Sequence, residues 1–380
     1  MHKKNYFYIV FALILELILA GPFFGWPSLA KMLKDQGVAN SSDTILNWIF
    51  TTAMVGRLFA VPIQGLINDR YGPAILMYSS LVLAFIGCCL VAWANTQLGL
   101  WISGYLLYGI ASNGIHVSII SSAKHLLKEH ATIFVSLCNG FFDLGTLVFT
   151  GVRLLNMKPQ YFFEFWCVGT AIVFLLVIWW PQEEKPYIAA SKYLLQLKEP
   201  LTSPLYLLFI INHVIIFYWI SAYLGTVQSR SNSDITSIFS IIMAFIGFGL
   251  SFVVGPTIRK FGYLKSWILI YTLLWIWTIM LIIPGGIITT ILSFVFYSIA
   301  RPFYYSVSAN YIADKFGYTL FGRLLCLSYL ASGPFTFTQT PLLSLALYLD
   351  TFWVSDSLQI ATLLLATGFI FIVKKHEQPL

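Results

Sequence analysis

The sequence predicts an all-α membrane protein that crosses the bilayer many times. Three observations support this prediction: 58% of the 380 residues are hydrophobic, only 10% are charged, and the apolar residues gather into long runs. Soluble domains contain roughly 45–50% apolar and about 25% charged residues. A chain of this composition cannot hide its apolar surface in water, and its 17% aromatic content excludes low-complexity disorder.

Twelve apolar runs, each bounded by charged or turn residues, are long enough to cross a bilayer as helices. A spanning helix needs about 20 apolar residues, whereas barrel strands would alternate over about ten. The expected helices cover residues 6–33, 44–67, 74–94, 99–122, 131–154, 163–180, 205–228, 235–255, 266–283, 287–312, 318–345 and 356–373.

The first run imitates a secretory signal, because two lysines precede it. It continues to residue 33, too long for the apolar part of a signal peptide, so we interpret it as the first spanning helix. Gly21-Pro22 and Gly25-Trp26-Pro27 are expected to break this helix, and a Ser-Gly-Pro sequence is expected to break the eleventh.

The basic residues indicate the orientation. Most of the 22 Lys and Arg residues fall in the short loops that are cytosolic if both termini are cytosolic. This distribution explains the +7 charge without a nucleic-acid partner, since the basic residues form no continuous face. We expect a monomer in a plasma membrane or a bacterial inner membrane.

The five cysteines lie in apolar runs without metal-ligand spacing, so no metal or cofactor is expected.

The longest connection, residues 181–204, falls at the centre of the chain. We expect it to be a cytoplasmic loop between an N-terminal bundle, residues 1–180, and a C-terminal bundle, residues 205–380, with six helices each. The loop at residues 65–72 has a counterpart of similar pattern at residues 255–262, 190 positions later. Such a repeat predicts two halves of similar structure.

Gly65, Asp69, Arg70 and Gly72 form a pattern that resembles the signature of the major facilitator superfamily. The resemblance implies that fold, with twelve helices in two six-helix bundles. It also implies that Asp69 holds the halves together at the cytoplasmic side as a conformational latch, with the eleventh helix as its partner. The glycines permit a tight turn, and the carboxylate can accept hydrogen bonds from a helix N-terminus.

A narrower resemblance involves Gly-Trp-Pro-Ser-Leu at residues 25–29 and the segment from Asn139 to Asp143. Both are similar to the solute-carrier branch that includes equilibrative transporters of large neutral amino acids and of nucleobases. The chain differs from that branch in lacking a large outer loop and a long central loop. The resemblance implies a neutral amino acid or a nucleobase as substrate.

Four charged residues stand out well inside predicted spans: Glu16, Arg57, Asp143 and Arg301. An ionised side chain at mid-bilayer costs about 2.5–3.5 kcal/mol on insertion scales, so these residues point to a site or a pathway. Two acids and two bases suit mutual pairing in a central cavity, in pairs that the sequence leaves open. Glu16 and Arg57 are candidates for coupling, although each could instead form a salt bridge that only positions helices.

Polar and aromatic residues recur near these charges at helical spacing. Arginine and asparagine suit a carboxylate or carbonyl, aspartate suits an amine, and aromatic rings suit an apolar group. The candidate substrate-binding residues are Asn113, Asn139, Asp143, His213, Arg301, Tyr304 and Tyr305.

These features predict a transporter of a small polar organic solute that works by alternating access, with a neutral amino acid ahead of a nucleobase. Hydrolase, zinc-protease and nucleotide-binding motifs are absent from the sequence, so we do not expect an enzyme. One alternative is a proton-coupled carrier of an organic anion, in which Arg57 and Arg301 would hold carboxylates. Others are a membrane-embedded enzyme and a transport-inactive receptor.

Overall fold

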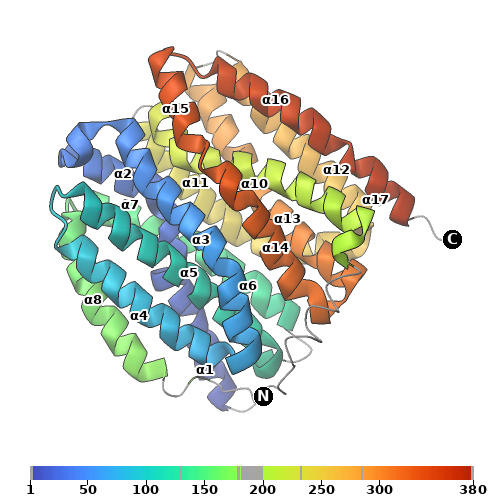
Figure 1. Cartoon of the computed structure of the whole chain (residues 1–380), viewed down its shortest axis with the longest axis horizontal. Coiled ribbons are helices and arrows are strands. Elements are labelled where there is room, and N and C mark those ends of the chain that lie inside the picture. The colour runs from blue at the N-terminus through green and yellow to red at the C-terminus, as the bar shows by residue number, and fades with distance from the viewer. Residues whose placement is uncertain are drawn as a thin grey trace.

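The computed structural model describes residues 3–127, 131–177, 180, 200–231, 233–283 and 286–377. Figure 1 shows the helices of the first half, blue to green, beside those of the second half, yellow to red. Most of the predicted central loop, residues 181–199, lies outside the described residues, so its boundaries stay a prediction.

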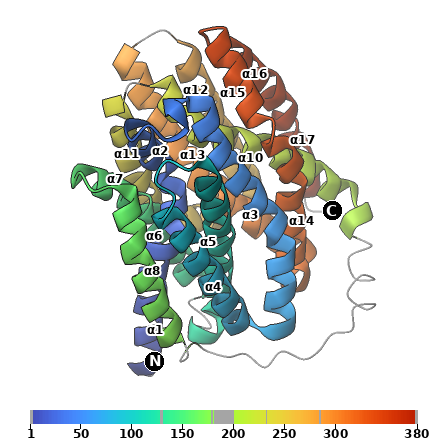
Figure 2. The same ribbon diagram turned by 60° about the vertical axis from the view of Figure 1, so that its left-hand side comes forward.

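In the first half, long helices follow one another through short turns. They are α1 (Lys3–Leu15), η1 (Glu16–Ala20), η2 (Gly21–Gly25), α2 (Trp26–Asp35), η3 (Val38–Ser41), α3 (Asp43–Tyr71), α4 (Pro73–Ala92), α5 (Leu98–Leu127), α6 (Ala131–Gly145), α7 (Leu147–Leu154) and α8 (Pro159–Leu176). Figure 2 shows α1 and α2 towards opposite ends of the bundle, as expected if the first run crosses it.

The second half has the same character. Its helices are α10 (Pro204–Arg230), α11 (Ser233–Ser251), α12 (Val254–Ile282), α13 (Gly286–Phe316), α14 (Tyr318–Thr336), α15 (Gln339–Tyr348), α16 (Trp353–Thr367) and α17 (Phe369–Glu377). Within the described part of the chain, 9 helical stretches are long and apolar enough to cross a membrane. Grouped across their breaks, the helices follow the predicted runs in order, which confirms the all-α membrane fold.

The first helix is broken where its glycines and prolines predict, by the π-helical η1 and the 3-10 helix η2. Three side chains of α5 bond to carbonyl groups there: Tyr105 donates to the carbonyl of Phe23 at 2.7 Å, and Tyr108 and Ser112 donate to neighbouring carbonyls at 3.0 and 2.8 Å. Broken helices are tolerated inside a membrane when such partners satisfy the freed backbone groups. The break is therefore a built part of the fold.

A close approach of two backbones holds α6 against this break. A Cβ atom added to Gly145 would lie 2.7 Å from both the Cα atom of Gly21 and the carbonyl oxygen of Leu17. Small residues at helix crossings let backbones approach in this way. The contact brings η1 and η2 against the part of α6 that contains Asp143.

The predicted span 131–154 is not one continuous helix, because the structure divides it into α6 and α7 at Thr146. The Thr146 hydroxyl donates to the carbonyl of Asp143 at 2.7 Å, and the Thr146 amide donates to the same oxygen at 3.2 Å. Such i−3 bonds tighten and end the last turn of a helix. The helix thus breaks directly after the buried acid.

The repeated loop makes a turn of the same hand in each half. Gly72 ends α3 with φ 86°, and Gly262, 190 positions later, interrupts α12 with φ 75°. Residues with a side chain rarely adopt a backbone conformation of positive φ, which explains why both loops carry glycine at this point.

The two halves also meet through uncharged polar side chains around Ser28. The Ser28 hydroxyl lies 3.2 Å from that of Ser240 on α11, and the Thr51 hydroxyl lies 2.9 Å from that of Thr340 on α15. Asn47 donates to Thr340 at 3.2 Å. All five are buried. We refer to them as the hydroxyl seal, and to this part of the bundle as the Ser28 end.

Candidate functional site

A buried ion pair joins the two halves. Arg301 on α13 donates from Nη1 to the Asp143 carboxylate on α6. Asp143 is 5% exposed and Arg301 is 3% exposed, so the pair is almost fully withdrawn from solvent. Removing one member of such a pair leaves an uncompensated buried charge, which is strongly destabilising. The structure thus settles which base meets Asp143.

Gly247 of α11 makes room for the carboxylate. A Cβ atom added to Gly247 would lie 2.7 Å from the Cβ atom of Asp143, closer than side-chain atoms approach, whereas one added to Gly249 on the same helix would meet nothing within 4 Å. Position 247 therefore needs glycine for the ion pair to form.

We expect Gly247→Ala to displace Asp143 and to lower the substrate affinity at least about tenfold, the equivalent of about 1.4 kcal/mol. Binding should be measured by titration of purified protein, with Gly249→Ala as the matched control on the same helix. Equal affinities in the two variants would contradict this role for Gly247.

Aromatic rings surround the arginine. The Arg301 guanidinium carbon lies 5.0 Å from the centroid of Phe24 and 5.5 Å from that of Tyr305. Cations are stabilised over aromatic faces at such distances. Phe24 belongs to η2, so the break in the first helix contributes a wall to this site. Phe24 was not among the candidates, which were polar and charged residues and two aromatic residues of the tenth predicted span.

Glu16 pairs with a histidine rather than with an arginine. Its carboxylate oxygens lie 2.9 and 3.0 Å from Nδ1 of His116 on α5, and Glu16 is fully buried. The His116 ring also lies 4.7 Å from that of Phe142, between centroids. The two coupling candidates, Glu16 and Arg57, thus occupy separate contacts.

Arg57 is held by amide side chains. Its Nε donates to Asn113 at 3.1 Å, and Asn113 donates in turn to Gln64 at 2.7 Å. Asn113, a candidate for substrate binding, therefore reaches the site through Arg57. Gln64 was not among the candidates, although it lies seven residues after Arg57 on α3 and so shares its face.

Two further candidates contact each other inside the second half. The Tyr304 hydroxyl lies 2.7 Å from Nδ1 of His213, and both residues are fully buried. Asn139 lies one turn before Asp143 on α6 and is half-buried. The structure therefore brings Asp143, Arg301 and Tyr305 together, and it places His213 with Tyr304 in a separate contact. The substrate-binding roles stay predictions.

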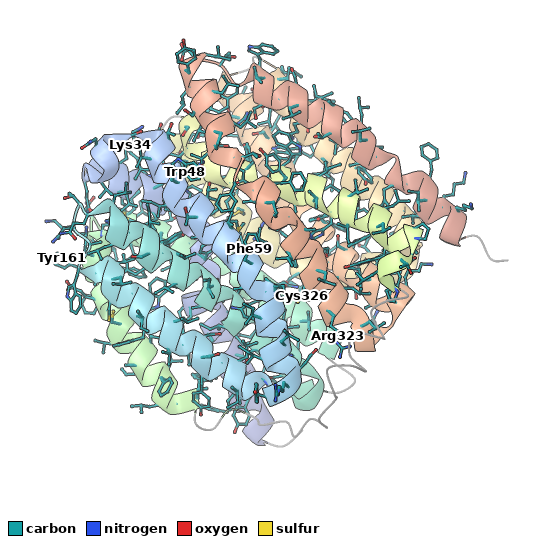
Figure 3. The ribbon with its side chains drawn as sticks, viewed as in Figure 1. Lys34, Trp48, Phe59, Tyr161, Arg323 and Cys326 are labelled. Atoms are coloured by element: carbon teal, nitrogen blue, oxygen red, sulfur yellow. The ribbon has the colours of Figure 1, made fainter. Side chains whose placement is uncertain are left out.

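The proposed latch lies where α3 crosses α14. The Asp69 carboxylate is 3.5 Å from Nε of Arg323, on the helix expected as its partner, and a Cβ atom added to Gly65 would lie 3.3 Å from Sγ of Cys326. Figure 3 shows Phe59, Cys326 and Arg323 in succession along this crossing. Arg323 was not among the candidates, although it lies in the eleventh run near its start.

Gly72 and Arg70 belong to the same loop, and their part in the latch stays a prediction. Gly72 provides the left-handed turn, and the Arg70 guanidinium lies 5.2 Å from the centroid of Tyr71. A partly exposed ion pair contributes about 0.2–1 kcal/mol. The pair of Asp69 and Arg323 can therefore bias a conformational equilibrium without locking it.

We expect Asp69→Asn to preserve the fold, to shift the resting population towards the inward-facing state by up to about fivefold, and to slow transport. Accessibility of introduced cysteines from each side of the membrane measures the population. The exchanged pair Asp69→Arg with Arg323→Asp should restore the wild-type distribution. Unchanged labelling and unchanged transport in Asp69→Asn would exclude the latch.

Secondary transporters are commonly built from two helical halves with the substrate site at their interface, and this bundle has two halves that meet around buried polar groups. The chain belongs to the Major Facilitator Superfamily, whose family model matches residues 7–335. It is a multi-pass membrane protein.

Solved transporters share this fold at low sequence identity. The xylose transporter XylE from E. coli, in a partially occluded inward-open conformation, superimposes with a TM-score of 0.70 at 16% identity, with 98% of each chain covered. The nucleoside transporter NupG superimposes with a TM-score of 0.68 at 11% identity, covering 97% of this chain and 100% of that one.

The chain is also similar in sequence to Protein FMP42 of Saccharomyces cerevisiae. The two are 28% identical over 169 residues, which are 40% of this chain and 33% of that protein.

Proposed function

We propose that this transporter carries a neutral amino acid, ahead of a nucleobase, by alternating access. The observation that supports this proposal is the ion pair of Asp143 and Arg301, which places opposite charges from opposite halves side by side. A zwitterion carries one group for each: its ammonium group can replace Arg301 at Asp143, and its carboxylate can replace Asp143 at Arg301. Both buried charges then keep a partner when the pair opens.

The same exchange would link solute binding to the movement of the halves. A solute that contacts Asp143 on α6 and Arg301 on α13 holds the halves together in an occluded state. When the solute leaves, the two side chains pair again, and the empty carrier can return. A ligand shifts such an equilibrium only through different affinities for its states, and contacts to both halves provide that difference.

The aromatic wall suits an apolar side chain. Phe24 and Tyr305 flank Arg301, so a hydrophobic amino acid would have rings beside its aliphatic part. A nucleobase could stack on these rings but is uncharged at neutral pH, so it could not satisfy both members of an opened ion pair. This difference favours the amino acid.

Counterflow in proteoliposomes tests the proposal. Vesicles that contain purified protein and are preloaded with L-leucine should accumulate labelled L-leucine well above protein-free vesicles. Vesicles preloaded with adenine should not accumulate labelled leucine. Accumulation of adenine alone would support the nucleobase instead, and transport of neither solute would contradict the proposal.

A proton-coupled carrier of an organic anion is the second candidate, because Arg57 is a further cation at the site and the Glu16 carboxylate contacts the His116 ring. If Glu16 carries a transported proton, Glu16→Gln should abolish acid-stimulated uptake and spare equilibrium exchange. Uptake measured across acid and neutral pH, with and without a collapsed proton gradient, checks this. Wild-type uptake that is flat under all these conditions would support a purely equilibrative carrier.

We further propose that both termini lie in the cytosol, which places the Asp69 loop on the cytosolic side and the Ser28 end outside. The distribution of basic residues supports this orientation. With all recognition groups in one chain, the protein would work as a monomer in a plasma membrane or a bacterial inner membrane.

A further inference from the structure

Arg57 differs from the other charged residues at the centre of the bundle. Glu16 contacts His116, and Asp143 contacts Arg301. Arg57 has no carboxylate within ion-pair distance among the residues that the structure describes. Its Nη1 atom is buried and has no hydrogen-bond partner there. A guanidinium nitrogen that is buried without a hydrogen-bond partner is costly, so its presence points to an anionic ligand.

Arg57 and Arg301 share one aromatic ring. The guanidinium carbon of Arg57 lies 4.7 Å from the centroid of Phe24, and that of Arg301 lies 5.0 Å from the same centroid. One arginine comes from α3 and the other from α13. The ring of Phe24 therefore lies beside guanidinium groups from both halves.

The guanidinium of Arg57 is held in place from behind. Nε donates to Asn113, Asn113 donates to Gln64, and Gln64 donates at 2.7 Å to the carbonyl oxygen of Ile110 on α5. Asn113 and Gln64 are 7% and 5% exposed. This chain of hydrogen bonds ends on helix backbone, so it fixes the side chain of Arg57 and leaves the Nη atoms for a ligand.

We propose that Arg57 binds the carboxylate of the transported solute together with Arg301, and that Gln64 and Asn113 are positioning residues for it. The inference rests on the proposed function and adds an energetic reason for binding. When a zwitterion binds between Asp143 and Arg301, two ion pairs replace one. Binding also removes both charges of the solute from water. The contact to Arg57 pairs a cation that had no anion before, and so it favours the loaded state.

Matched ligands separate this contact from general recognition. L-Leucine carries both charges, L-leucinamide lacks the carboxylate, and 4-methylpentanoate lacks the ammonium group. Their dissociation constants for detergent-purified protein are measured by calorimetry or by thermal-shift titration. Wild-type protein should bind leucine at least about tenfold more tightly than leucinamide, a difference of about 1.4 kcal/mol.

In Arg57→Gln, the dissociation constant of leucine should rise at least about tenfold and that of leucinamide less than about twofold, so the preference for the carboxylate disappears. Binding of 4-methylpentanoate should be lost. Arg259→Gln is the control, because it removes the same charge from an exposed position in the second copy of the loop. It should leave the dissociation constants of all three ligands unchanged.

Gln64→Met keeps the size of the side chain and removes both hydrogen bonds. It should raise the dissociation constant of leucine about threefold and leave that of leucinamide unchanged. In protein that already carries Arg57→Gln it should cause no further loss of leucine affinity, because the effects of residues that act on one contact are not additive. An equal further loss in the double variant would show that Gln64 acts structurally.

The outcomes distinguish the two proposals. If Arg57→Gln weakens leucine and leucinamide equally, or if wild-type protein does not distinguish them, the carboxylate contact is excluded while leucine counterflow can still hold. If 4-methylpentanoate binds in an Arg57-dependent way without leucine counterflow, the inference holds and the amino-acid assignment fails. Variants are compared only where their thermal midpoint without ligand matches that of wild-type protein.

Discussion

Asp143→Asn and Arg301→Gln should each weaken substrate binding at least about tenfold and abolish counterflow. Each change removes one member of a pair whose residues are 5% and 3% exposed and leaves the other as a buried group without its charge partner. Breaking a buried pair in this way costs about 3–5 kcal/mol. Calorimetric titration and counterflow on purified, folded variants measure both losses.

The double variant Asp143→Asn with Arg301→Gln separates recognition from architecture. With both charges gone, no unpaired charge remains, and the thermal midpoint should recover towards that of wild-type protein. Binding and transport should stay lost, because the solute needs both groups. If transport recovers together with stability, the two residues serve only the structure, and the proposed recognition by Asp143 and Arg301 is wrong.

The second large effect concerns the crossing of α6 with the broken first helix. Gly145→Leu should prevent this crossing, because a Cβ atom there would already lie 2.7 Å from the backbone of Gly21 and of Leu17. Overpacking a tight contact costs about 1–3 kcal/mol, and more where backbone must move. We expect little monodisperse protein in size-exclusion chromatography and a clearly lowered thermal midpoint.

Gly151→Leu is the matched control, since a Cβ atom at Gly151 on α7 would meet nothing within 4 Å. Its yield and midpoint should resemble those of wild-type protein. Similar behaviour of the two leucine variants would mean that glycine at position 145 is not required for the crossing.

Hydropathy was sufficient to predict the spans, because an apolar helix in a bilayer has few alternatives. The break at Gly21 and Pro22 was also predictable, since glycine and proline interrupt helices by their own backbone chemistry. The break at Thr146 was not. Threonine is common inside spans, and only the local bonds to the carbonyl of Asp143 show that it ends α6.

The candidate site was predicted as a set of residues but not as a set of contacts. The four intramembrane charges stood out because each is costly in an apolar run. Their partners lie far along the chain: Asp143 and Arg301 are 158 residues apart, and Glu16 and His116 are 100 apart. Helical periodicity predicts which residues share a face of one helix, but it does not predict which other helix packs against that face. It therefore could not show that Glu16 contacts a histidine or that His213 contacts Tyr304.

The hydroxyl seal determines what must happen when the Ser28 end opens. The contacts of Ser28 with Ser240 and of Thr51 with Thr340 are neutral hydrogen bonds, each with a net contribution of about 0.5–1.5 kcal/mol. Water can replace every one of these partners, because a hydroxyl both donates and accepts. Separation of the halves at this end therefore amounts to wetting a narrow polar seam. Arg153 of α7 also donates across the halves to Ser237 of α11 at 2.6 Å, so water must replace this charged contact as well, and the barrier depends on how readily water enters.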